Sequence, residues 1–465
     1  MATLPQPTTP AFLQTLHWIA QPDAFFERTA ADLGTTFRVK IANPAGLIWT
    51  SDPTLIQEIL TQDENGRYTA PGEVNAMLAP LLGDRSMIML SGAEHRRHRK
   101  LTMPAFHGER MRAYTEAILT ATRQAFGRIP HGSVFTTRDV MQAITMDVIL
   151  TAVFGLQADD RHNDRFARIK PIVTTMLDML ASPLSVSVLF FPILQQDLGA
   201  WSPWGRFLAQ RRQLDTLLFA EIAERRANPD PSRNDVLNML LDTRDEYGET
   251  LTDEELRDEL MTMLFAGHET TATALAWATY WIHRDRQVYT QLIDELSTID
   301  IDTDPMTVFR LPYLTAVCNE TLRIYPVAML TFPRTPIEPV EFSGERIEPG
   351  ELLMGSIYLL HHNPAIYPDS KTFNPDRFLD RQYSPFEFMP FGAGSRRCLG
   401  MALAQFEMKL VLAALLQGWT LELADKAPVV PQRRGVTLGP KGGVLAKLTG
   451  TRSVLVHQDA AAIVG

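Results

Sequence analysis

The chain has 465 residues, of which 45% are apolar and 21% are charged, a globular composition that argues against a largely disordered protein. The formal net charge of −10 argues against nucleic acid as the main partner, because phosphate binding requires a basic face. There are only two cysteines, Cys318 and Cys398, which favours free thiols in a reducing compartment. Residues 1–22 hold neither a signal peptide nor a membrane-spanning stretch, so we expect a cytoplasmic protein without a transmembrane anchor.

In chain order, the first predicted elements are two short runs of β-forming residues, Phe37–Ile41 and Gly46–Thr50. They predict a hairpin around Asn43-Pro44. A helix is predicted over Asp52–Gln62, and most of the chain between Gly92 and Phe265 shows helical spacing of apolar residues.

A capping-box pattern at Thr252–Glu255 predicts the start of a helix that continues to about His283. At 1.5 Å per residue this helix would be roughly 45–50 Å long, enough to cross the whole molecule. Short β-like segments follow at Val340–Phe342 and Leu352–Ile357, and a last helix is expected at about Gly400–Gln417.

These elements predict a mainly α fold of the α+β type, a helix-rich single domain with small β-sheets at its margins. The domain is expected over residues 23–456, between an N-terminal extension of residues 1–22 and a C-terminal tail of residues 457–465. The stretch Asn228–Pro231 is open to reading as a domain boundary, but surface loops of this size are common within domains.

The most informative segment is Phe391–Gly400, which lies directly before the last apolar helix. A cysteine at a helix N-terminus, here Cys398, has its thiolate stabilised by the helix dipole. The glycines let backbone N–H groups approach the sulfur, and Arg396 is placed to pair with a carboxylate. Two other interpretations are a structural cysteine beside a turn and a dinucleotide-binding loop at Gly392 and Gly394. The second lacks the strand that such a loop follows.

Two further motifs precede this loop. In the middle of the long helix, Ala266–Thr271 contains an adjacent acid and alcohol, Glu269 and Thr270, which can organise a water relay that delivers protons. The alternative is a Thr-rich segment that simply packs. Glu320 and Arg323 are one helical turn apart and able to pair, although such a pair alone is usually a surface ion pair of little energy.

The strongest basic cluster is Glu94–Lys100, where His95 and Arg99 share one helix face. From the residues alone it is open to two interpretations: a nucleic-acid or membrane surface, and a solvated helix face. The pair His361-His362 suggests a metal site only weakly, because adjacent residues point to different faces.

Together these motifs resemble those of the cytochrome P-450 family, at family spacing over essentially the whole chain. The segment Phe391–Gly400 is similar to the heme-binding signature, Ala266–Thr271 to the oxygen-activation motif, and Glu320-x-x-Arg323 with Pro375–Phe378 to the E-x-x-R and P-E-R-F elements. Asp376 stands where the family more often has Glu, and His95 where it often has Trp.

The resemblance implies a cytochrome P-450 fold that binds heme b (iron protoporphyrin IX), with Cys398 as the axial ligand of the iron. Other residues that it assigns to the heme are His95, Arg99, Ala266, Arg334, Phe391, Gly392, Arg396 and Gly400. It assigns Glu269 and Thr270 to catalysis. It places Glu320, Arg323 and Arg377 in a buried network that supports the heme pocket.

The implied reaction inserts one oxygen atom of dioxygen into a C–H or C=C bond and reduces the other to water. The family spacing leaves no room for a fused flavin domain, so a separate ferredoxin and ferredoxin reductase are expected to supply two electrons. Some basic residues of the Glu94–Lys100 cluster are expected to dock this acidic donor. A monomer is expected.

Apolar segments expected to line the substrate pocket are Met261–Phe265, Val327–Phe332 and Thr437–Pro440, with Leu184–Ile193 as an entrance, although plain core packing explains each of them equally well. These apolar segments favour a small lipophilic substrate. The sequence also resembles soluble bacterial, particularly cyanobacterial, relatives of fatty-acid hydroxylases, which favours a fatty acid or a terpenoid as the substrate.

Alternative functions are a peroxide-driven or hydroperoxide-rearranging heme enzyme, a non-enzymatic heme carrier or sensor, and a helical interaction protein without heme. The acid–alcohol pair argues against the first two.

Overall fold

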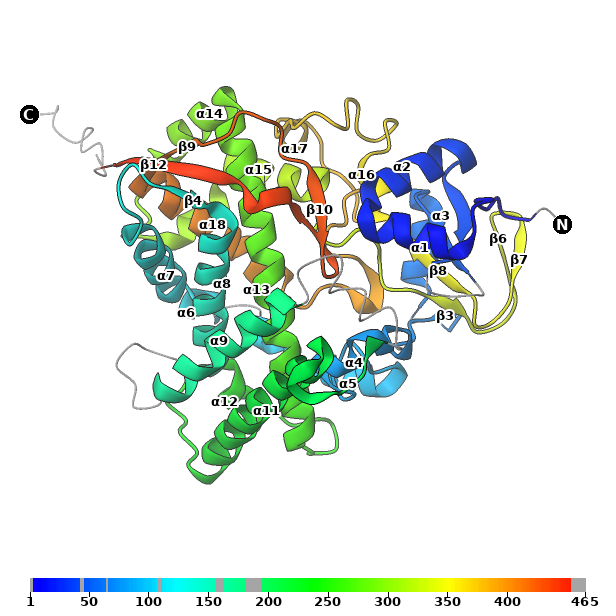
Figure 1. Ribbon diagram of the computed structural model, residues 1–465, viewed down its shortest axis with the longest axis horizontal. Helices are drawn as coiled ribbons and strands as arrows, with labels where there is room; N and C mark the ends of the chain where they lie inside the picture. Colours follow the sequence, from blue (N-terminus) through cyan, green and yellow to red (C-terminus); the bar gives the residue numbers. More distant parts are fainter. Residues whose placement is uncertain are drawn as a thin grey trace, which may run out of the picture.

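Helix α13 (Asp253–Arg284) runs through the centre of the molecule, with the other helices packed around it (Figure 1). Thr252 accepts a hydrogen bond from the Glu255 N–H, and the Glu255 carboxylate accepts one from the Thr252 N–H. Both free donors at the helix start are thus satisfied. The prediction of one long helix from Thr252 to about His283 is confirmed.

The computed structural model describes residues 3–41, 46–63, 66–106, 110–155, 163–179 and 194–452. Its other helices are α1 (Ala11–Ala20), α2 (Pro22–Leu33), α3 (Pro53–Thr61), α4 (Ala79–Leu82), α5 (Gly92–Thr102), α6 (Arg110–Ala113), α7 (Thr115–Gly127), α8 (Thr137–Phe154), α9 (Asn163–Met179), α11 (Pro203–Ala227), α12 (Val236–Asp242), α14 (Arg286–Leu296), α15 (Pro312–Ile324), α16 (Ile357–His361), α17 (Arg377–Asp380) and α18 (Met401–Gly418). The strands are β1 (Thr36–Val39), β2 (Leu47–Thr50), β3 (Tyr68–Thr69), β4 (Val134–Thr136), β5 (Thr335–Pro336), β6 (Val340–Phe342), β7 (Glu345–Ile347), β8 (Leu352–Gly355), β9 (Trp419–Leu423), β10 (Pro431–Arg434), β11 (Thr437–Pro440) and β12 (Leu445–Thr451).

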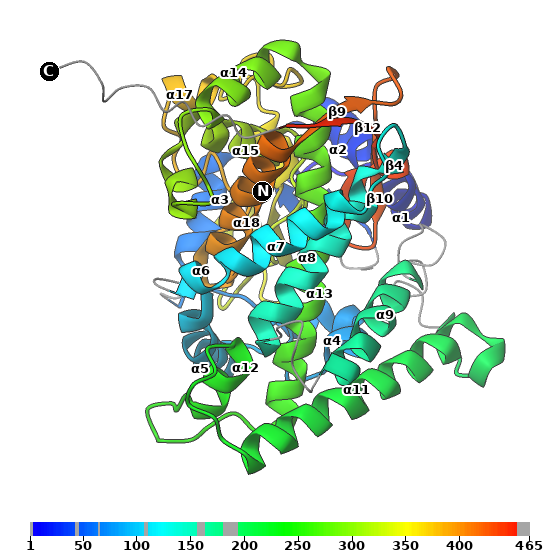
Figure 2. The ribbon, with the colours of Figure 1, turned by 90° about the vertical axis from the view of Figure 1, so that its left-hand side faces the viewer.

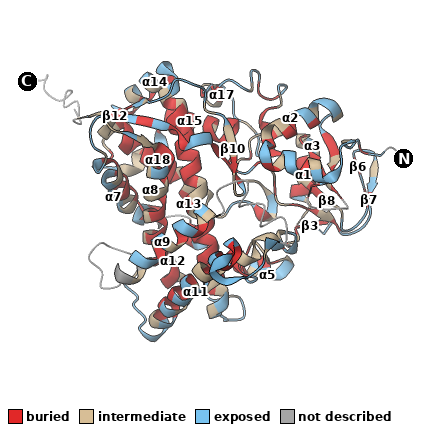
Figure 3. Cartoon of the chain, viewed as in Figure 1, coloured by how far each residue is buried: buried red, intermediate tan, exposed pale blue. Residues whose placement is uncertain are grey.

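The largest apolar core is formed by the long helices. Helix α8 lies along α13 (Figures 1 and 2), and α7, α11, α15 and α18 contribute buried side chains to the same cluster. Figure 3 shows that the buried residues concentrate on these helices, whereas the outer helices α9 and α11 expose one face. The core thus sits on both sides of α13, so polar groups on this helix need partners inside the protein.

The β-structure is small and lies at the margins, as predicted for this mainly α fold. Strands β1 and β2 form the expected antiparallel hairpin, and β8 extends it in parallel to β2. Near the C-terminus the structure has a further antiparallel hairpin, β10–β11, which packs against α13.

Among the described residues, one helix, α18, is long and apolar enough to cross a membrane. Two thirds of its apolar stretch is buried within the protein, as expected for a core helix.

A fully buried ion-pair network joins α15 to the segment around α17. The Glu320 carboxylate accepts hydrogen bonds from Arg323 Nε at 2.6 Å and from Arg377 Nε at 3.1 Å. Glu320 and Arg323 have no exposed surface, and Arg323 also donates to the His361 carbonyl. The sequence motif thus corresponds to three side chains that lie together, with one carboxylate shared by two cations.

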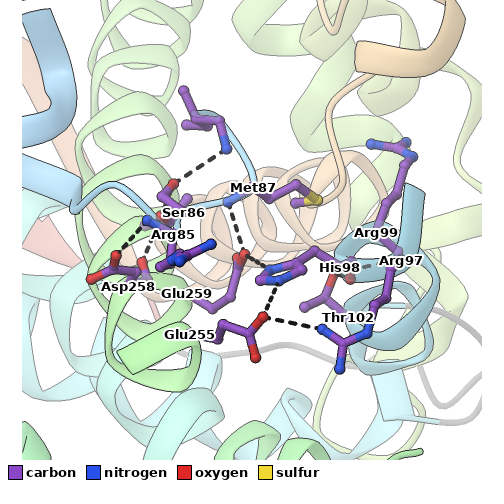
Figure 4. Close-up of polar contacts among 12 residues, drawn as sticks. Arg85, Ser86, Met87, Arg97, His98, Arg99, Thr102, Glu255, Asp258 and Glu259 are labelled. Atoms are coloured by element: carbon purple, nitrogen blue, oxygen red, sulfur yellow. Dashed lines mark hydrogen bonds and ion pairs between the residues drawn. The ribbon is translucent and has the colours of Figure 1, made fainter. Parts of the chain in front are cut away.

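A second buried polar cluster joins α5 to the first turns of α13 (Figure 4). The His98 ring lies between two carboxylates of α13, with Nδ1 2.8 Å from Glu259 and Nε2 3.1 Å from Glu255. Arg97 also reaches Glu255, and the Met87 N–H donates to Glu259. Burial alone lowers the pKa of His98, but the two carboxylates outweigh this effect and raise it.

We expect Glu320→Gln to lower the free energy of unfolding by about 3–5 kcal/mol, because it leaves two buried guanidinium groups without an anion. The measurement is denaturant unfolding followed by circular dichroism. Glu348→Gln is the control, since its ion pair with Arg346 is exposed and should contribute less than about 1 kcal/mol. Equal losses in the two variants would contradict this prediction.

We expect His98→Gln to destabilise the protein more at pH 6 than at pH 9. A histidine whose folded-state pKa is raised contributes its full stability below the unfolded pKa of about 6.5, and this contribution is lost as the pH rises through the folded pKa. At pH 6 the variant should lose about 1.5–3 kcal/mol, the usual range for hydrogen bonds to charged groups. Unfolding curves at both pH values measure the difference, and a loss independent of pH would refute the role of the charge.

Candidate active site

The cysteine loop is a tight backbone structure directly before α18. The Cys398 N–H donates to the Phe391 carbonyl at 2.9 Å, and Gly400 is the residue that precedes the first turn of the helix. Gly394 has φ +70°, and a Cβ atom there would lie 2.3 Å from the Leu60 carbonyl oxygen. Only glycine fits at this position, because the backbone of the loop runs directly against the end of α3.

The Cys398 side chain is exposed, although many protein atoms surround it and their presence raises the pKa of its thiol. The Gly400 N–H, Arg99 and Arg397 lower the pKa of the thiol, but burial outweighs them. The expected stabilisation by the helix terminus is therefore present but insufficient on its own, and the thiol loses its proton when a metal cation takes the place of that proton.

Helix α13 has an open position in its middle. Ala266 is exposed, although Leu260–Phe265 before it and Thr271–Ala274 after it are buried. On a core helix such an alanine borders an internal space. The exposed Cys398 and the exposed Ala266 are therefore two small surfaces that a bound group would cover.

Four predicted cofactor-binding residues form one basic neighbourhood. Burial and the charges of Arg396, Arg99 and Arg334 lower the pKa of His95 to about 3. Burial and the charges of Arg334 and Arg99 lower the pKa of Arg396 to about 10. Arg99 also acts on the Cys398 thiol, which links this basic neighbourhood to the cysteine. Mutually repelling buried cations favour an anionic ligand, and the two propionates of heme b fit this requirement.

Two of these arginines also hold the protein itself together. Arg334 is fully buried and donates to Asp63 at 2.8 Å and to the Phe332 carbonyl. Arg396 donates to the Ala70 carbonyl and two further carbonyls near it. Asp63 was not predicted from the sequence, and it also accepts from the Ser395 hydroxyl at 2.7 Å. The Arg334 pair spans 271 residues, and no local pattern indicates such a contact.

The predicted catalytic pair on α13 faces two directions. The Thr270 hydroxyl donates to the Ala266 carbonyl at 2.6 Å, so its oxygen remains able to accept a hydrogen bond from the open side. The Glu269 carboxylate is bound by α8 through Arg138 and through Gln142 at 2.6 Å. The two residues are adjacent in sequence, but their hydrogen bonds lead to different parts of the structure. Arg138 lies 131 residues away from Glu269, beyond the reach of sequence patterns.

The adjacent histidines His361 and His362 form hydrogen bonds with backbone groups. His362 contacts the carbonyls of Ile324 and Ser370, and His361 Nε2 accepts from the Met389 N–H, so both rings serve the fold. No cluster of three potential metal-binding side chains occurs among the residues that the structure describes.

Two of the predicted pocket segments meet beside α13. The Leu438 N–H donates to the Val327 carbonyl at 3.0 Å, and Trp277 Nε1 donates to the Leu438 carbonyl at 3.1 Å. Strand β11 thus joins α13 to the segment after α15. The predicted entrance Leu184–Ile193 lies outside the described residues.

Comparisons with known proteins show the family to which the chain belongs. The family model "Cytochrome P-450" matches residues 4–446. The protein named cytochrome P-450 135B1 of Mycobacterium tuberculosis is 34% identical over 430 residues, which cover 92% of this chain and 88% of the relative. Cytochrome P-450 135A1 of the same species is 32% identical over 448 residues, with 96% and 94% covered.

A solved structure described as "Retinoic acid bound cyanobacterial CYP120A1" superimposes with a TM-score of 0.84 at 24% identity, covering 97% of this chain and all of the other. This likeness shows the fold. Together with the family model and the relatives, it shows that the chain belongs to the cytochrome P-450 family of monooxygenases, whose cofactor is heme b.

Proposed function

We propose that this chain oxidises a lipophilic substrate, a fatty acid or a terpenoid, by hydroxylation or epoxidation, with Cys398 as the heme ligand. The observation that carries the proposal is the exposed Cys398 thiol, which lies within reach of the charge of Arg99 in the basic neighbourhood of His95, Arg334 and Arg396. A heme iron bound to a thiolate activates dioxygen, because the thiolate pushes electron density onto the iron and favours O–O cleavage.

Within this proposal, His95, Arg99, Arg334 and Arg396 hold the two propionates of the heme, and Ala266, Phe391, Gly392 and Gly400 contact the ring or the sulfur. Burial and the neighbouring arginines lower the pKa of His95 to about 3 in the structure, so the arginines rather than His95 supply the positive charge that attracts the propionates.

Thr270 is proposed to hold a proton-bearing water at the open side of α13. Its own hydrogen is engaged by the Ala266 carbonyl, so the oxygen acts as an acceptor that orients the water. Glu269 is then a positioning residue rather than the direct donor, because Arg138 and Gln142 hold both of its oxygens. Protons would reach Thr270 through water near this ion pair.

The choice of substrate class rests on apolar surroundings. Val327 and Leu438 are buried, and the exposed Val436 lies at the tip of the β10–β11 hairpin. The structural neighbour's description names bound retinoic acid, a terpenoid acid, which supports a substrate of this chemistry. A ferredoxin with its reductase is proposed as the electron donor, and the protein is proposed to work as a cytoplasmic monomer.

A peroxide-driven enzyme is the second candidate. It is favoured by one observation: the Glu269 carboxylate is turned to α8 and not to Thr270. A peroxide route needs no controlled delivery of protons to bound dioxygen. Product formation with hydrogen peroxide but none with dioxygen and a ferredoxin system would select this candidate.

We expect Cys398→Ser to abolish the red-shifted Soret band of the reduced carbon-monoxide complex, because that band requires a thiolate ligand. Absorption spectra of the purified, heme-loaded protein measure it. Cys318→Ala is the control, since Cys318 is buried in the apolar core and should leave the band unchanged. A band retained in Cys398→Ser would refute the ligand assignment.

We expect Thr270→Ala to lower, by at least tenfold, the amount of product formed per electron pair consumed. Without the Thr270 oxygen as acceptor, the water is not oriented and delivers protons in the wrong order. The ratio is measured with a fatty acid and with a terpenoid acid. Thr279→Ala is the matched control: this buried threonine of α13 makes the same hydrogen bond to the carbonyl one turn earlier, at Leu275. An unchanged ratio in Thr270→Ala would remove Thr270 from proton delivery.

A further inference from the structure

Arg433 on β10 carries a buried charge that no acid in the described part of the chain neutralises. It is only 6% exposed, and its Nε is buried without a hydrogen-bond partner. Its guanidinium lies over the ring of Trp18, 3.8 Å from the ring centroid. Burial lowers the pKa of Arg433 to about 10, which leaves the group charged at neutral pH.

The other buried arginines behave differently. Within the described residues, each of them donates hydrogen bonds to a carboxylate or to backbone carbonyls: Arg138, Arg211, Arg225, Arg323, Arg334, Arg377 and Arg396. The next residue of β10, Arg434, lies 3.9 Å from Glu269. A contact with an aromatic face stabilises a cation less than the loss of its water destabilises it, so the Trp18 ring alone does not balance Arg433.

The side chains around Arg433 are apolar and buried. Arg433 is paired with Leu438 across the hairpin, and cross-strand partners project on the same face of a hairpin. Leu438 belongs to a buried cluster with Met329 and Trp49, against which Trp18 also packs. Met329 lies in the segment Val327–Phe332. One cation set among apolar walls matches an amphiphile with a single anionic end.

We propose that Arg433 binds the carboxylate of an amphiphilic acid substrate, whose apolar part lies beside the β10–β11 hairpin. This inference rests on the proposed oxidation of a lipophilic substrate and makes it specific: the substrate is an acid, held at the end remote from the oxidised carbon. A carboxylate fits better than a phosphate, because one buried guanidinium balances one negative charge, and a phosphate monoester carries more than one.

The test compares matched acids and alcohols on the heme-loaded full chain: dodecanoic acid with 1-dodecanol, and retinoic acid with retinol. Affinity is read from the change in heme absorbance on titration, and folding from the melting temperature and the reduced carbon-monoxide band. The variants are Arg433→Met and Arg433→Lys. Lys441→Met is the matched control, since it removes one positive charge from the exposed end of the same hairpin.

We expect the unmodified protein and Lys441→Met to bind the acid of at least one pair tenfold or more tighter than its alcohol. Arg433→Met should lose this preference while its affinity for the alcohol changes less than twofold, and Arg433→Lys should keep part of it. Equal affinity for acid and alcohol in the unmodified protein, or an equal loss of both in Arg433→Met, overturns the inference but leaves the oxidation of lipophilic substrates intact. Binding of none of the four ligands would overturn both.

Discussion

A helix buried along most of its length must find a partner for each polar side chain it carries, and this constraint on α13 shapes the rest of the protein. Its first turns offer Glu255 and Glu259, which are matched by His98 on α5. Its middle offers Glu269, which is matched by Arg138 on α8. These contacts fix α13 against α5 in its first turns and against α8 in its middle. Between them lies Ala266, which is exposed although the residues before it on the helix are buried.

The same electrostatic rule explains why the candidate site attracts an anionic cofactor that carries a metal. Arg334 and Arg396 are buried close to one another, and the charge of Arg334 lowers the pKa of Arg396. Asp63 balances part of this charge. The Cys398 thiol nearby is held protonated by burial, so a metal cation that replaces the proton and carboxylates that meet the arginines satisfy both requirements together.

The sequence predicted the parts of the fold that depend on local pattern. The capping box at Thr252 and the periodic apolar residues after it defined α13, and the glycine-rich segment before α18 located Cys398, because both signals lie within a few residues. Partners far apart in the chain could not be predicted in this way. The pairs Arg138–Glu269 and Arg334–Asp63 join segments more than a hundred residues apart, and nothing in the neighbouring residues of either member indicates the other.

The β10–β11 hairpin shows how far such long-range placement changes the interpretation of a residue. In sequence, Arg433 and Arg434 are two adjacent basic residues before a glycine, typical of an exposed turn. In the structure, strand alternation sends them to opposite faces, one toward the apolar cluster of Trp18 and the other toward Glu269. The charge of Arg433, which would cost little free energy on the surface, is therefore buried. Since a buried charge is tolerated only with a counterion or a ligand, Arg433 requires an anion that no acid in the described part of the chain supplies.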